Sequence, residues 1–138
     1  MAEEIRLSAA VMFVRNLNRS VAFYQEVIGL RVTDTSTTAA LLAGGDGTQL
    51  VLRATGENSP HPLGQVGIQY LAWMVPSKDD LDHRADLLRR RGGFQDTRSD
   101  SGVTVVEGRD PDDVVVMLIH AEGGRAGMRE LPARIYAW

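Results

Sequence analysis

The strongest constraint on the fold is a succession of elements that begins with a strand and a capped helix. Residues 5–14 form an apolar, β-rich run, and Asn16 and Asn18 can then each offer a side-chain oxygen to the free N–H groups at a helix start. The apolar residues within 19–28 recur at helical spacing, and Gly29 suits the left-handed conformation that ends a helix. These features predict a strand over 5–14 and a helix over 19–28.

Three further strands are predicted after this helix. They cover residues 30–35, 38–43 and 49–54, and the sequence GGDG at 44–47 is a strong hairpin signal between the last two. The first part of the chain therefore has the order βαβββ.

The same order then occurs a second time. Ser77 can cap a helix that carries Leu81, Ala85 and Leu88 on one face, and Gly92–Gly93 ends this helix. The turn sequence DPDD stands where GGDG stands in the first copy. The strands of the second copy are predicted over 68–75, 94–97, 103–107 and 114–120. Two copies of one module are therefore expected.

A tandem βαβββ repeat predicts an α+β fold, in which a helix lies behind each half of a curved mixed sheet. Each half-sheet has one face covered by its helix and a second apolar face left open, so two such halves side by side form a cup for a small ligand. We expect a single domain over 1–138, with module one at 5–54, a linker at 55–67, module two at 68–121 and a C-terminal tail at 122–138.

Composition narrows the functional classes. The chain has no cysteine, which excludes disulfides, thiolate nucleophiles and Cys-ligated zinc. A formal net charge of −3, with interspersed signs, argues against a nucleic-acid partner. No apolar run approaches membrane-spanning length, and residues 1–10 lack the features of a signal peptide. We therefore expect a cytoplasmic protein that binds neither nucleic acid nor membranes.

The sequence FVRNLNRSVAFYQEVIGLRV, together with the later DPDD turn and the VVVML that follows, resembles the vicinal oxygen chelate superfamily. This superfamily includes glyoxalases, extradiol dioxygenases, fosfomycin-resistance enzymes, methylmalonyl epimerases and bleomycin-resistance binding proteins. The resemblance covers roughly residues 5–121 and implies a homodimer. Asn16 stands where the first-helix pattern of the superfamily usually has Asp. The positions that match the pattern are Val14, Leu17, Arg19, Ser20, Phe23, Tyr24 and Gly29.

Metal-dependent members of this superfamily have ligands in the first and the last strand of each module. Divalent metals need oxygen, imidazole or thiolate donors, and the side chains at these positions here are unsuitable. We therefore expect no metal and no other cofactor. A shift of one residue in strand register would instead turn Gln69 or His120 inward. The resemblance places the four ligand positions at Ala9, Val51, Tyr70 and Met117.

The side chains predicted to line the cup are mostly apolar, with a few polar groups. Tyr70 offers a ring for stacking and a hydroxyl, the methionines adapt to irregular shapes, and Gln49 and Arg53 can orient a carbonyl or an acidic group. The alternative is that these residues form an ordinary core and fill the cup themselves. The predicted lining residues are Ala9, Val11, Phe13, Gln49, Val51, Arg53, Tyr70, Ala72, Met74, Val115, Met117 and Ile119.

These features lead to three hypotheses of function. The first is a metal-free protein that binds an apolar or aromatic small molecule, such as an antibiotic or another natural product, and confers resistance or self-protection by sequestration. The second is a cofactor-free isomerase, cyclase or lyase, with Tyr70, Arg53 or Glu107 as acid, base or oxyanion partner. The third, a metal-dependent glyoxalase or dioxygenase, requires the shift of register.

Overall fold

The computed structural model describes residues 5, 7–61 and 64–123, so the predicted tail lies almost wholly outside the described residues. The chain divides into two compact units, Met1–Pro60 and His61–Trp138. Each unit contains one βαβββ module, which confirms the predicted α+β fold with a tandem repeat. The first unit is module one, and the second unit is module two.

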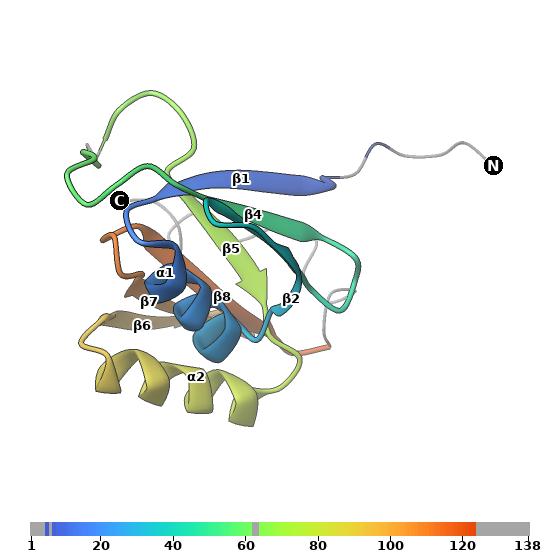
Figure 1. The fold of residues 1–138 in the computed structure, drawn as a ribbon. Coiled ribbons are helices and arrows are strands. Elements are labelled where there is room, and N and C mark those ends of the chain that lie inside the picture. The colour runs from blue at the N-terminus through green and yellow to red at the C-terminus, as the bar shows by residue number, and fades with distance from the viewer. Residues whose placement is uncertain (1–4, 6, 62–63, 124–138) are drawn as a thin grey trace. The chain divides into compact units, whose positions relative to one another are not determined.

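Module one is a four-stranded mixed sheet with one helical segment (Figure 1). Its strand order is β1-β4-β3-β2, with β1 parallel to β4 and the other neighbours antiparallel. The first strand begins at Ala9 rather than at residue 5, because its partner strand begins at Gln49, the residue paired with Ala9. The elements are β1 (Ala9–Val14), α1 (Leu17–Phe23), η1 (Tyr24–Ile28), β2 (Arg31–Thr35), β3 (Ala39–Ala43) and β4 (Gln49–Ala54).

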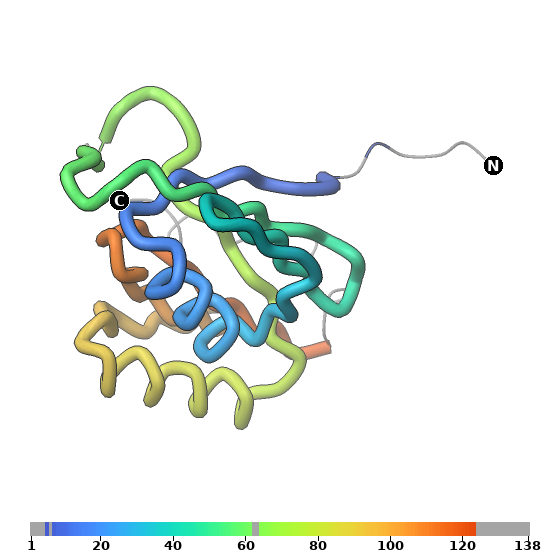
Figure 2. Tube along the Cα trace, in the orientation of Figure 1, coloured from blue at the N-terminus to red at the C-terminus, as the bar shows by residue number. Residues whose placement is uncertain are grey.

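The helical segment of module one changes from an α-helix to a π-helix. Asn16 is the N-cap in an extended conformation, and its Oδ1 accepts a hydrogen bond from the Arg19 N–H at 3.0 Å. The helix predicted over 19–28 is found there, but it begins two residues earlier, at Leu17, and its residues from Tyr24 form a π turn. Gly29 closes this turn with a left-handed φ of 82°. In Figure 2 the trace passes from α1 into η1 without a break.

The core of module one lies on the side of the sheet that faces this helix. Phe23 and Tyr24 are both buried, and their rings meet edge to face with centroids 5.0 Å apart. The helix α1 contacts β3 and β4, which contribute the buried residues Leu42, Leu50 and Leu52. Large side chains from both the helix and the sheet therefore fill this core.

Module two has the same strand arrangement. Its order is β5-β8-β7-β6, with β5 parallel to β8 and the other neighbours antiparallel. The strand β6 continues to Asp100, whereas the sequence predicted its end at residue 97, because β7 runs alongside and pairs with it to Val103. The elements are β5 (Tyr70–Met74), α2 (Lys78–Arg90), β6 (Phe94–Asp100), β7 (Val103–Arg109) and β8 (Val115–Ala121).

The helix of module two begins and packs as the sequence predicts. The Ser77 Oγ accepts a hydrogen bond from the Asp80 N–H at 3.0 Å, and both residues lie at the helix start. The predicted helix face, Leu81, Ala85 and Leu88, is buried. Within the described residues, no helix of either module has the length and apolar character needed to cross a bilayer.

Two glycines allow α2 and its sheet to approach each other closely. A Cβ atom on Gly93 would lie 2.5 Å from the Arg109 carbonyl oxygen, and a Cβ atom on Gly108 would lie 2.8 Å from Leu88 Cδ1. The Arg109 N–H also donates to the Gly93 carbonyl at 2.7 Å. Side chains larger than hydrogen at these two positions would therefore separate the helix end from β7.

Candidate functional site

In module one, alternate residues of β1 and β4 turn away from the helical segment. The register pairs the six predicted ligand-binding residues of this module across the β1–β4 ladder, so all six share one face. Val11 is 63% exposed and Phe13 is 68% exposed, and Arg53 is exposed as well. This surface, the open face of module one, is apolar and aromatic beside one cationic side chain. The three pairs are Ala9 with Gln49, Val11 with Val51, and Phe13 with Arg53.

The corresponding open face of module two is divided into an accessible part and a closed part. Tyr70 is partly buried, and Ala72 and Met74 next to it on β5 are exposed. Val115 and Met117 on the neighbouring strand β8 are each only 2% exposed. Tyr70 packs against a buried cluster of Val103, Val105, Val115, Met117, Ile119 and Ala121. All six lining residues predicted for module two share this face, and their role in binding stays a prediction.

An ion pair interrupts the apolar surface of this second face. The Arg98 Nη2 donates to the Glu107 Oε1 at 3.0 Å, and the same nitrogen lies 3.8 Å from the Met117 sulfur. Register pairs Arg98 with Val105, a member of the buried cluster. Glu107, one of the predicted acid–base candidates, is therefore held by a guanidinium group.

The four positions where the superfamily has metal ligands do not fit a metal here. Their side chains offer a methyl group, an isopropyl group, a phenol and a thioether, which together cannot hold a divalent cation against water. Among the described residues, no three of the His, Cys, Asp and Glu side chains lie close enough together to form a metal site. On the open face of module one these positions are Ala9 and Val51, and on that of module two they are Tyr70 and Met117.

The shift of register that would supply a better ligand is absent. His120 lies on the opposite side of β8 from Met117, with its Nδ1 3.3 Å from the Val75 carbonyl oxygen. Gln69 lies just before β5, and its Nε2 donates to the Gln65 and Gly67 carbonyls. Neither side chain is placed as the metal-dependent hypothesis requires.

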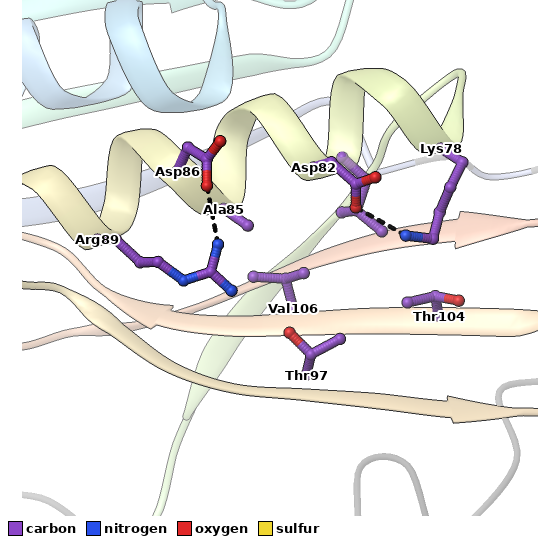
Figure 3. Close-up of a pocket in the computed structure, with 9 residues that line it drawn as sticks. Lys78, Asp82, Ala85, Asp86, Arg89, Thr97, Thr104 and Val106 are labelled. Carbon is purple, nitrogen blue, oxygen red and sulfur yellow. Dashed lines mark hydrogen bonds and ion pairs between the residues drawn. The ribbon is translucent and has the colours of Figure 1, made fainter.

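A cavity lies on the helix side of module two. It is a groove of about 470 Å³ between α2 and the strands β6 and β7 (Figure 3). Lys78 and Arg89 reach into it from opposite ends of the helix, and each pairs with an aspartate of the same helix, at 2.7 and 2.9 Å. The residues that line it are Lys78, Leu81, Asp82, Ala85, Asp86, Arg89, Thr97, Thr104 and Val106.

A second depression, of about 400 Å³, lies near the β6–β7 turn of the same module. Hydroxyl and charged side chains line it, and the Ser99 and Thr104 hydroxyls lie 3.1 Å apart. None of the residues predicted to bind a ligand lines either cavity. Both cavities were missed because polar positions on a helix and an edge strand look like ordinary solvated surface in a sequence.

Arg98 was missed for a different reason. The predicted strand ended at residue 97, one position before it, so Arg98 was left outside the predicted sheet. Glu107 was identified, but its partner was not. The available signal for a longer strand was the alternation of polar and charged residues, which continues through Phe94–Asp100.

Comparisons with known proteins agree with this architecture. A family model described as "Glyoxalase/Bleomycin resistance protein/Dioxygenase superfamily" matches residues 6–118. No curated protein sequence was found to match.

Solved structures with the same fold come from several bacteria. A glyoxylase/bleomycin resistance protein/dioxygenase domain from Frankia sp. is 21% identical, with a TM-score of 0.74 over 86% of this chain and 99% of that one. A putative glyoxalase from Bacillus halodurans is 20% identical, with a TM-score of 0.71 over 83% and 94% of the two chains. A lactoylglutathione lyase from Agrobacterium tumefaciens is 19% identical, with a TM-score of 0.66 over 86% and 96%. At these identities the likeness shows the fold alone.

Proposed function

The chain belongs to the Glyoxalase/Bleomycin resistance protein/Dioxygenase superfamily, and on that premise we propose that it is a metal-independent binding protein for a mostly apolar, partly aromatic small molecule. Sequestration of an antibiotic or another natural product is the role that fits this activity. The ligand contacts the open face of a module, and its affinity comes from burial and aromatic stacking, without a covalent step.

One observation carries this proposal. The four positions that supply metal ligands in metal-dependent members of the superfamily hold side chains without suitable donors, and the same faces present accessible apolar groups. Phe13 and Val11 supply such groups in module one, and Ala72 and Met74 supply them in module two. Burying one such large side chain against a ligand contributes roughly 1.5–3 kcal/mol, which is enough to support micromolar binding by a few contacts.

The arrangement of Glu107 gives no support to the cofactor-free enzyme. A general base must reach the proton that it removes, and this carboxylate accepts its hydrogen bond from Arg98. Both side chains are largely buried in the same apolar surroundings. Glu107 is better placed to orient a guanidinium group than to move a proton.

Titration calorimetry against a panel of aromatic natural-product antibiotics tests the proposal, with each titration repeated in EDTA. We expect saturable one-to-one binding that EDTA does not alter, and an unchanged mass for the ligand recovered afterwards. The Phe13→Ala variant should bind about tenfold more weakly, because roughly 1.4 kcal/mol of apolar contact is lost.

Thr97→Ala is the matched control for this variant. Thr97 lines the groove on the helix side of module two, so its truncation should leave the affinity unchanged. Binding that disappears in EDTA, or a ligand that returns with a different mass, would contradict the proposal.

The homodimer implied by the resemblance is part of the same proposal, and light scattering of the purified protein tests it. A cytoplasmic location, and the lack of a nucleic-acid or membrane partner, stay predictions.

A further inference from the structure

Arg98 occupies an unusual place on the open face of module two. It lies on β6, the edge strand of its sheet, and it is in register with Val105. Its guanidinium group reaches the Glu107 Oε1 at 3.0 Å and the Met117 sulfur at 3.8 Å. A cationic group is thus held over the apolar cluster that contains Val105 and Met117.

Packing alone does not explain this ion pair. The side chains are 27% exposed for Arg98 and 14% for Glu107, so both charges are largely removed from water. Removing charges from water is costly, and well-packed apolar residues at such positions are often at least as stable. Module one has an apolar residue, Leu41, at the position equivalent to Glu107. The two positions are equivalent because each residue belongs to the first strand pair after the β-bulge of its sheet.

The pair also leaves hydrogen-bonding capacity unused. A guanidinium group has five N–H donors on three nitrogens. The Arg98 Nε is buried without a hydrogen-bond partner, and it lies 3.9 Å from Asp96 Oδ2. Within the described residues only Nη2 of this side chain donates a hydrogen bond, to the carboxylate of Glu107 and weakly to sulfur. Glu107 therefore fixes the orientation of the group. Of the nitrogens that it leaves without a hydrogen bond, Nε is buried and Nη1 is not, so Nη1 is the donor that a ligand can reach.

We propose that Arg98 is a specificity-determining residue, which selects ligands that carry an anionic group, a carboxylate or a sulfonate, on an aromatic or apolar body. This inference rests on the proposed function and adds the chemical class of the ligand. The anion receives charge-assisted hydrogen bonds from Nη1 of the guanidinium, in surroundings that strengthen them because water is scarce. The apolar body of the ligand contacts the accessible side chains of β5.

Two fluorescent probes that differ mainly in a sulfonate test this directly. The anion is 8-anilinonaphthalene-1-sulfonate, and its neutral counterpart is N-phenyl-1-naphthylamine. Their dissociation constants are measured by fluorescence titration for the wild-type protein and for Arg98→Met, which keeps an unbranched apolar side chain and removes the charge. We expect the variant to bind the anion about 30-fold more weakly, the loss of one charged hydrogen bond, and the neutral probe within about twofold.

Two further variants make the result specific. Arg90→Met removes an exposed arginine from α2, outside the open faces, and should leave the ratio of the two dissociation constants unchanged. Arg98→Lys keeps the charge without the planar fork and should recover part of the preference for the anion. Because this variant retains a cation beside Glu107, it reports on recognition even if Arg98→Met disturbs the fold, which circular dichroism checks.

The outcomes separate the two proposals. Selective loss of the anion in Arg98→Met, with partial recovery in Arg98→Lys, supports the inference. Equal effects on both probes, or none on either, overturn the role of Arg98 and leave the proposed binding function intact. Failure of both probes to bind the wild-type protein overturns both proposals, since the open faces then accept no aromatic guest.

Discussion

The two modules share a strand order, and both have a β-bulge early in the pairing of their outer strands, yet their helices pack on their sheets by different means. In module one the helical segment packs through large side chains, because Phe23 and Tyr24 fill the space between it and the sheet. In module two the contact depends on missing side chains, because Gly93 and Gly108 allow the helix end and β7 to meet. One topology therefore has two packing solutions.

The open faces differ as well. Module one exposes apolar side chains, with Phe13 as the largest, and it has Leu41 where module two has Glu107. In module two most side chains of the open face form a buried cluster, and the ion pair of Arg98 with Glu107 lies beside it. The two modules thus share their strand pairing and differ in their open faces.

The largest expected effect tests the aromatic core of module one. Phe23→Ala should lower the free energy of unfolding by about 4 kcal/mol, because a fully buried ring leaves a cavity. Phe13→Ala, in the same module, should cost less than about 1 kcal/mol, because its ring is 68% exposed. Urea denaturation measures both. Similar losses in the two variants would show that the face of Phe13 is packed, and the contrast between the modules would fail.

A smaller effect is expected for the glycine contact of module two. Gly93→Ala should destabilise the protein by about 2–3 kcal/mol, because its Cβ would lie 2.5 Å from a backbone oxygen that has little room to move. Gly45→Ala in the hairpin of module one is the matched control, since a Cβ there meets nothing within 4 Å. Its stability should stay within about 0.5–1 kcal/mol of the wild type. Thermal unfolding of the two variants decides whether the close approach is required.

The smallest effect concerns a feature that the modules share. Asn16→Ala and Ser77→Ala each remove one side-chain cap from a helix start, and each should cost about 1 kcal/mol. Chemical denaturation measures the loss, and Asn16→Asp and Ser77→Thr, which keep an acceptor oxygen, serve as controls. A cost confined to one module would mean that the other helix is fixed by packing alone, which would sharpen the difference between them.

Local sequence patterns account for most of the fold. The caps at Asn16 and Ser77, the helix end at Gly29 and both hairpin turns follow from short-range chemistry, and each is found where the sequence predicts it. The π turn from Tyr24 is not predictable in this way. The apolar spacing of the segment predicts an α-helix throughout, so the π turn depends on packing against the sheet, which the spacing does not contain.

The candidate site was less predictable. Alternation along a strand is enough to assign Val11 and Phe13 to one face, and the register agrees. Alternation does not tell whether such a face is accessible, and Met117 is buried where Phe13 is exposed. The pairing of Arg98 with Glu107 depends on how far β6 extends along β7, a long-range property that no short sequence window contains.

The glycines at 93 and 108 also limit how this protein can be recombined. A hybrid with the helix of module one on the sheet of module two would place the large rings of Phe23 and Tyr24 against an interface where glycine leaves no room for a side chain. The reverse hybrid would leave a cavity. A helix can therefore be exchanged only together with its own sheet, and the smallest exchangeable part of this architecture is a complete module.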